Sequence, residues 1–360
     1  MADENPHRQI GYWVDGLISD SYMAIIYSFN RNAGSIMTDH RSFKQASQEV
    51  SQDMPQNMPQ SVPQNSLALI LSQRFDLAGA RSLEAQFYHM ETRVIQFAQD
   101  GKRAGIETFY LDLSCTPAGL TGKDGDEYIC HKFSVQKDKE TALEIPALKG
   151  WTYIFRKTAN NRDEKGQVLG IDHTRFEKLL DAEGKVLPPG TAYFIYNAFI
   201  DFHSFCDSFA RPTSGGGHGI QDLNAVGQKI IHQAAFSEPS VDLGGHVATG
   251  STFKNGEVTL TFKGLGRVSE RPCAIIAFDS GESSFTVIMS PLPGQEAKTI
   301  GASHYKGDIF IDLETRWVKR AEMTELVVSE TSLPGMKDKI GGIVERQLKI
   351  ESVTESSFPG

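Results

Sequence analysis

The residues best suited to chemistry gather in one short stretch of this chain. His203, Cys206 and Asp207 lie close together, and His218 follows after a glycine-rich loop. On a helix, His203 shares a face with the residues three and four positions later, so its imidazole can meet Cys206 or Asp207. Imidazole, thiolate and carboxylate are metal ligands, and a histidine beside a carboxylate can also move a proton. We therefore predict His203, Asp207 and His218 as catalytic candidates, with or without a metal.

A structural interpretation competes with this catalytic one. His203 can be a core histidine whose nitrogens are hydrogen-bonded, and Asp207 can mark the end of the helix. Asp201 and His203 point about 200° apart on a helix, so these two side chains do not face one ion. The spacing of the candidate residues is common in proteins, which favours the structural interpretation. The sequence identifies no particular cofactor.

The segment that positions these residues is dense in aromatic side chains. Its rings recur every three or four residues, which predicts a helix with a long aromatic ridge: Tyr193, Tyr196, Phe199, Phe202, Phe205 and Phe209. Other apolar residues widen the ridge, so such a helix must be enclosed by the rest of the protein. We predict that Phe199, Phe202 and Phe205 line a cavity for an apolar or aromatic ligand, with Phe262 and Trp317 contributed by strands.

Stretches on both sides of this helix have the period-two pattern of antiparallel strands. Residues 107–113 and 129–135 alternate apolar and polar side chains, and Asp100-Gly101 predicts a turn before the first of them. Asn255-Gly256 predicts a two-residue hairpin that leads into a strand over 257–263. A capping-box spacing from Thr174 to Glu177 predicts a short helix that runs through Leu180.

These elements predict an α+β fold that is mainly antiparallel β. Two β-meander blocks form a curved sheet or cup around the central aromatic-rich helix and share one core. The predicted divisions are an N-terminal arm with a Gln/Pro-rich linker, a first β-rich block, the central helix with its glycine-rich loop, and a second β-rich block. Their bounds are 1–66, 67–190, 191–239 and 240–360.

Composition limits the partners and the compartment. The 360 residues carry a net charge of -9 with scattered Lys and Arg, which excludes nucleic acid as the expected partner. No apolar run approaches the roughly 20 residues that span a bilayer, so we expect no transmembrane segment. The start of the chain does not have the order of a secretory signal, which predicts a cytoplasmic protein, or an exported one if a signal was removed.

The cysteines and the N-terminal arm add two further expectations. The four cysteines have no CxxC spacing, which favours free thiols, with a Cys115–Cys130 disulfide as the alternative in an oxidising compartment. The N-terminal arm could join copies of the chain in a homo-oligomer.

Three functions remain open at this point. We favour a soluble binding or carrier protein for an apolar or aromatic small molecule. The alternatives are an enzyme with a metal or acid-base site near the end of the helix, and a structural or assembly protein whose core is filled.

Overall fold

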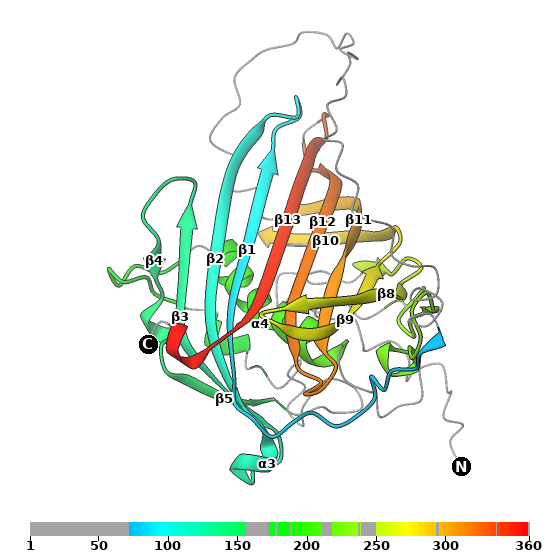
Figure 1. Ribbon diagram of the computed structural model, residues 1–360. Coiled ribbons are helices and arrows are strands. Elements are labelled where there is room, and N and C mark those ends of the chain that lie inside the picture. Colours follow the sequence, from blue (N-terminus) through cyan, green and yellow to red (C-terminus); the bar gives the residue numbers. More distant parts are fainter. Residues whose placement is uncertain are drawn as a thin grey trace, which may run out of the picture.

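The computed structural model describes residues 72–155, 171, 173–176, 179–187, 189–209, 218–236, 238, 250–292, 295–335 and 337–358. The predicted N-terminal arm and the glycine-rich loop at 211–217 lie outside these ranges. Within the described ranges, thirteen strands form one antiparallel sheet that does not close on itself (Figure 1). The predicted class, mainly antiparallel β around an aromatic helix, is confirmed.

Strands from both sides of the helix enter this sheet. The strands before the helix are β1 (Gln86–Phe97), β2 (Arg103–Thr116), β3 (Asp126–Lys137), β4 (Leu143–Glu144) and β5 (Trp151–Phe155). Those after it are β6 (Lys229–Ile231), β7 (Thr252–Lys254), β8 (Thr259–Val268), β9 (Arg271–Asp279), β10 (Ser283–Leu292), β11 (Gln295–Asp312), β12 (Val318–Ser332) and β13 (Ile340–Val353). The order β4-β3-β2-β1-β13-β12-β11-β9-β8-β6 places the pairing of β1 with β13 at the junction of the two groups.

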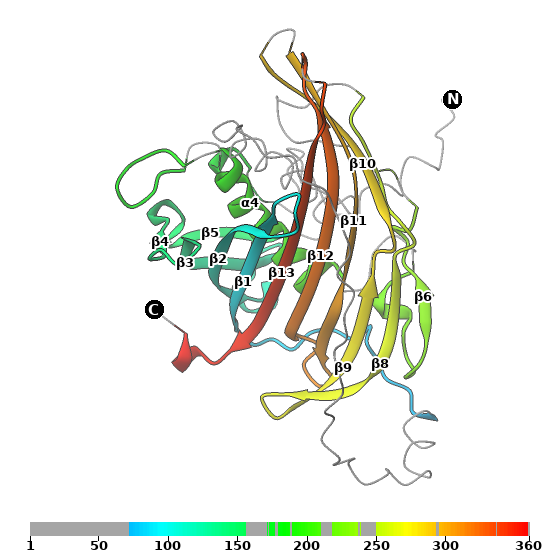
Figure 2. The same ribbon diagram turned by 90° about the horizontal axis from the view of Figure 1, so that it is seen from above.

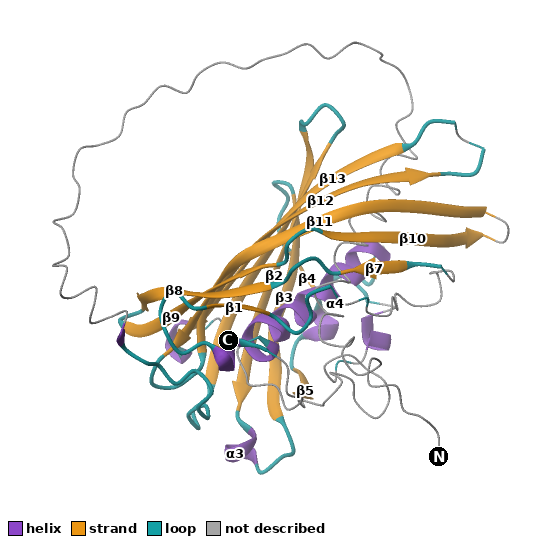
Figure 3. Cartoon of the chain, turned by 90° about the vertical axis from the view of Figure 1, so that its right-hand side faces the viewer, coloured by secondary structure: helices purple, strands orange, loops and turns teal. Residues whose placement is uncertain are grey.

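The long strand β11 divides the sheet. Residues 295–303 of β11 pair with β10, whereas residues 306–312 pair with β9 on the same side. Strand β10 also pairs with β7, so a short branch leaves the main sheet at this point. The strands twist and curve, and the helix α4 lies against one face of the curved sheet (Figures 2 and 3).

Helix α4 (Pro189–His203) continues into a π-helical turn, η5 (Ser204–Ser208). The rings of α4 and η5 contact rings from four strands, through the pairs Phe194–Phe109, Phe199–Phe133, Phe202–Tyr88 and Phe205–Phe278. The other helical elements are short: α3 (Ala118–Thr121), η3 (Pro146–Leu148), η4 (His173–Phe176), η6 (Ile220–Asp222) and η7 (Glu355–Ser357). The enclosure that the ridge requires is therefore provided by the sheet.

Two local predictions are wrong. Asn255-Gly256 does not form a hairpin, because β7 pairs with β10 while β8 pairs with β6 and β9. A Cβ atom on Gly256 would lie 2.6 Å from the carbonyl oxygen of Ser280, so this glycine permits a close approach of two backbone segments. The predicted helix does not run through Leu180, because this residue forms a β-bridge with Val186 after the 3-10 turn η4.

Candidate functional site

The three phenylalanines predicted to line a cavity are fully buried. Phe199, Phe202 and Phe205 each have 0% of their surface exposed. Their rings are surrounded by others, including Phe133, Trp151 and Phe176 around Phe199, Tyr88 and Tyr128 around Phe202, and Phe278 and Phe209 around Phe205. Among the described residues, the side of the helix that carries these three phenylalanines is in contact with other rings, as in a packed core.

His203, the last residue of α4, has a hydrogen-bond partner at each ring nitrogen. Its Nδ1 lies 2.7 Å from Oδ2 of Asp207, and its Nε2 lies 2.8 Å from the hydroxyl of Tyr153. The ring stacks on Phe155 with 4.6 Å between centroids and an interplanar angle of 1°. Since a carboxylate only accepts, Nδ1 donates its proton to the hydrogen bond with Asp207, while the Tyr153 hydroxyl is the hydrogen-bond partner of Nε2. The predicted pairing of His203 with Asp207 is present.

Asp207 is the centre of this network. Tyr128 donates to its Oδ2 at 2.8 Å, and Arg81 donates from Nη1 to its Oδ1 at 2.7 Å. Arg81 also donates to the carbonyl oxygen of Cys206 in the same π-helical turn. Burial, together with the Asp207 carboxylate, raises the pKa of the Cys206 thiol, so this sulfur is protonated at neutral pH. All four cysteines are free, as the spacing predicts.

His218 does not belong to this network. Its side chain is 78% exposed, and its Nδ1 lies 3.4 Å from Oδ2 of Asp222, the last residue of η6. Within the described part of the chain, no group of three or more His, Cys, Asp and Glu side chains could hold a metal ion. The structure therefore brings two of the three catalytic candidates together and places the third elsewhere.

The partners of the His203–Asp207 pair come from distant parts of the sequence. Arg81 precedes the first strand, Tyr128 lies on β3 and Tyr153 lies on β5. Strand alternation shows which side chains share a face, but it does not show which helix residue each one meets. No short-range signal identifies Arg81.

A second charged cluster is buried on the other side of α4. Arg346 on β13 donates from Nε to Glu325 on β12 at 3.0 Å, and it donates from Nη1 to Asp201 on the helix. All three side chains are at most 3% exposed. Asp201 and His203 thus face different partners, as their spacing on the helix requires. The cluster joins the helix to the central strands, because the one guanidinium of Arg346 contacts a carboxylate on each of them.

The face of the sheet opposite α4, which lies in front of α4 in Figure 1, carries a groove lined mostly by polar side chains. A groove of about 760 Å³ crosses strands β1, β13, β12, β11, β9, β8 and β6. The strand register places its side chains in two rows that run across the sheet. One row contains Lys229, Thr261, Ala277, Asp308, Glu322, Lys349 and Glu91. The other contains Thr259, Asp279, Lys306, Thr324, Gln347 and Arg93.

The charges in this groove are mixed. Two ion pairs form inside it, between Lys263 and Asp308 at 2.8 Å and between Arg93 and Glu91 at 3.9 Å. Among the described residues, Lys229 and Lys306 have no carboxylate within ion-pair distance. The groove therefore presents hydroxyl groups and both signs of charge to a molecule that enters it.

Comparisons with known proteins assign no family. No family model and no curated protein matches the chain. Among solved structures, the outer membrane channel DcaP of Acinetobacter baumannii is 8% identical, with 77% of this chain and 100% of that chain covered and a TM-score of 0.15. A loop L8 deletion mutant of OmpT, an outer membrane protein of Vibrio cholerae, is 7% identical, with 74% of this chain and 99% of that chain covered and a TM-score of 0.14.

These two similarities are too weak to carry an argument about fold or function. None of the helices within the described ranges combines the length and the apolar character needed to cross a membrane.

Proposed function

We propose that this chain is a binding protein and that its ligand lies in the polar groove on the open face of the sheet. The proposal rests on one observation, the two cross-strand rows of polar side chains that line a hollow of about 760 Å³. This volume lies within the range of about 300–1,000 Å³ that is typical of small-molecule sites.

The contents of the two faces of the sheet favour the polar groove as the place of the ligand. An apolar ligand would need space beside Phe199, Phe202 and Phe205, whose side chains are fully buried against other rings. His203 and Asp207 are also fully buried, and their hydrogen bonds join the helix to the strands. The polar groove, in contrast, is open to solvent along exposed side chains such as Lys306 and Thr324.

The charge pattern indicates the chemistry of the ligand. Five cationic and four acidic side chains line the groove, and they alternate with threonines: Arg93, Lys229, Lys263, Lys306 and Lys349, and Glu91, Asp279, Asp308 and Glu322. A ligand with one sign of charge would meet repulsion as well as attraction. A zwitterionic molecule, such as a short peptide with charged groups of both signs, complements this surface better.

A blocking substitution tests this proposal. Thr324 is exposed at the middle of the groove, so Thr324→Trp obstructs the middle of the groove without changing the core. Leu326→Trp is the matched control, because Leu326 is 49% exposed on the same face of β12 but does not line the groove. The assay is the shift in unfolding temperature with short charged peptides as probes.

We expect a peptide that stabilises the wild type and the Leu326→Trp variant but not the Thr324→Trp variant. Equal stabilisation of all three proteins would refute the groove as the binding site. Stabilisation by an apolar probe that persists in Thr324→Trp would instead favour a ligand site beside the aromatic helix.

A further inference from the structure

A second hollow, of about 440 Å³, lies away from the groove and shares no lining residue with it. Three separate segments line it: residues 78–83 before β1, residues 117–119 after β2, and Arg316–Trp317 in the turn between β11 and β12. Asp126 on β3 completes its wall. Several of the lining residues are glycine or alanine, which leaves room between the larger side chains.

Three of the residues that line this hollow carry buried hydrogen-bond donors without partners among the described residues. The Arg81 side chain is 8% exposed, and its Nη1 and Nη2 donate to Asp207 and to the Cys206 carbonyl. Across the described residues, however, its Nε has no acceptor. The same holds for Nε and Nη1 of Arg316 and for the hydroxyl of Ser82. Buried donors without acceptors are costly, at about 1–3 kcal/mol each and more when charged, so an acceptor is expected here.

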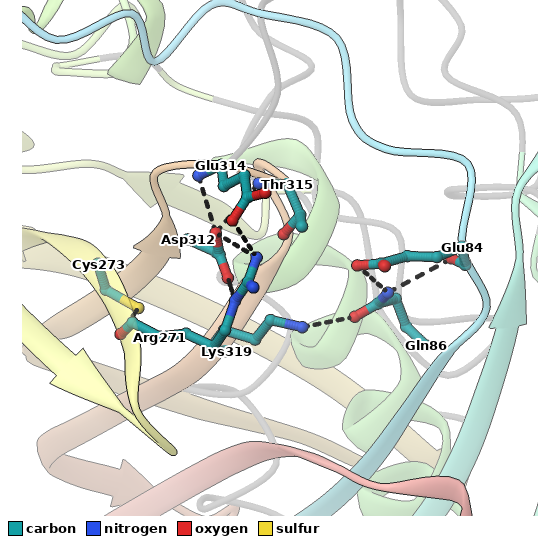
Figure 4. A network of polar contacts seen from close by, with 8 residues as sticks. All are labelled: Glu84, Gln86, Arg271, Cys273, Asp312, Glu314, Thr315 and Lys319. Atoms are coloured by element: carbon teal, nitrogen blue, oxygen red, sulfur yellow. Dashed lines mark hydrogen bonds and ion pairs between the residues drawn. The ribbon is translucent and has the colours of Figure 1, made fainter.

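The turn that carries Arg316 is held firmly. Oδ1 of Asp312 accepts hydrogen bonds from the backbone N–H groups of Glu314 at 2.8 Å and Thr315 at 3.0 Å (Figure 4). Its Oδ2 accepts a hydrogen bond from Nε of Arg271 at 2.7 Å. Burial by itself would raise the pKa of Asp312, but these hydrogen bonds lower it, so the carboxylate stays charged. Arg316 follows in the left-handed region, with φ 62°.

The facing wall is attached to the same turn. The Ser82 N–H donates to the carbonyl of Thr315 at 2.9 Å, and Nε1 of Trp317 donates to the carbonyl of Ser82 at 3.1 Å. The Arg81 guanidinium lies 4.1 Å from the centroid of the Trp317 ring. Arg81 and the turn that carries Arg316 are therefore positioned before any ligand arrives, which reduces the entropy lost on binding.

We propose that this hollow, the arginine pocket (Arg81, Ser82, Arg316 and Trp317), binds the anionic group of a small molecule, a carboxylate or a phosphate. Guanidinium groups donate charge-assisted hydrogen bonds to the oxygen atoms of both anions. The donors without partners on Arg81, Arg316 and Ser82 supply the hydrogen bonds.

Charge balance supports an anion at Arg316. The charge of Arg81 is matched by Asp207 at 2.7 Å, whereas Arg316 lies 3.9 Å from Asp76, whose side chain is 65% exposed. Exposed pairs at this distance are weak. The Asp126 carboxylate that lines the pocket already accepts a hydrogen bond from the backbone N–H of Ala118 at 3.0 Å. Of the two arginines in this pocket, Arg316 is thus the one whose positive charge is less balanced by nearby carboxylates.

The test is calorimetric titration of the full-length protein with inorganic phosphate and, separately, with succinate, at constant ionic strength. Arg316→Gln removes the less compensated cation and leaves the Arg81–Asp207 pair in place. Arg267→Gln is the matched control, because the Arg267 side chain is 72% exposed and pairs only with exposed Glu270 among described residues. Ser82→Ala tests the hydroxyl donor without any change of charge.

We expect at least one of the two anions to bind the wild type and the Arg267→Gln variant with the same affinity. Arg316→Gln then weakens binding about tenfold or more, and Ser82→Ala weakens it by a smaller factor. The anion that binds identifies the headgroup as phosphate or carboxylate. Binding of neither anion to the wild type, or equal binding to the Arg316→Gln variant, overturns the proposal. The groove function is tested separately, because no groove residue is changed.

Discussion

Replacing Phe199 tests whether side chains fill the interior beside α4 or leave a cavity for a ligand there. Its ring is fully buried, and its centroid lies 5.2 Å from Trp151 and 5.6 Å from Phe176. Phe199→Ala removes a buried aromatic side chain whose transfer from water contributes about 1.5–3 kcal/mol. The space left behind and the lost ring contacts add to this loss. We therefore expect the free energy of unfolding to fall by about 3–5 kcal/mol.

Urea unfolding measures this change, with the transition followed by circular dichroism and by fluorescence to check that both report one step. Phe236→Ala is the control, because this ring is 57% exposed and its loss should change stability by no more than about 0.5 kcal/mol. A loss below about 1 kcal/mol for Phe199→Ala would refute a closely packed interior, because a ring that lines an open cavity leaves few contacts behind. That result would restore the apolar-ligand site predicted from the sequence.

Three further predictions concern buried positions elsewhere. Burial lowers the pKa of His232 from 6.5 to about 4, so the neutral side chain contributes fully to stability above pH 6.5. About 3 kcal/mol of the free energy of unfolding is then lost as the pH falls to 4. Urea unfolding at several pH values should show this loss in the wild type but not in His232→Gln. Gly307→Ala should lower the free energy of unfolding by about 1–3 kcal/mol or more, because the new Cβ would lie 1.8 Å from a carbonyl oxygen of β12. Gly264→Ala is the control, because a Cβ there would lie in open space and should change the midpoint of urea unfolding little. Arg346→Met leaves two buried carboxylates without this guanidinium and should lower the free energy of unfolding by about 3–5 kcal/mol. Arg320→Met, at a partly exposed ion pair, should lower it by about 1 kcal/mol or less. Similar losses of stability for the two variants in a thermal unfolding assay would contradict the role of the buried cluster.

The sequence was sufficient to predict the features that depend on local periodicity. The three-to-four spacing of rings predicted helix α4, and its excess of apolar surface correctly required a sheet around it. Residues 107–113 and 129–135 alternate in the sequence and lie on β2 and β3. The Asp100-Gly101 turn is also present between β1 and β2, with φ 78° at the glycine.

Features that depend on distant pairing could not be read in this way. Asn255-Gly256 has the composition of a hairpin turn, but β7 and β8 each have better partners elsewhere in the sheet. Arg81 and Arg346 are ordinary arginines in sequence, and only the packing of α4 against the sheet brings them to Asp207 and Asp201. His218 was considered a partner of His203 because it follows closely in the chain, yet it pairs with Asp222 instead.

The pairing of β1 with β13 has a consequence for how the chain folds. The first and last long strands lie side by side in the middle of the sheet, with a register that extends from Phe87–Val353 to Phe97–Ile343. During synthesis, β1 and β2 emerge long before β13, so Tyr88 and Met90 have no complete sheet to pack in until the last strand is made. Contacts between such distant residues also make folding slow. A newly made chain therefore exposes apolar strands until β13 is made, and the loss of residues 340–353 would remove a central strand of the sheet rather than an edge.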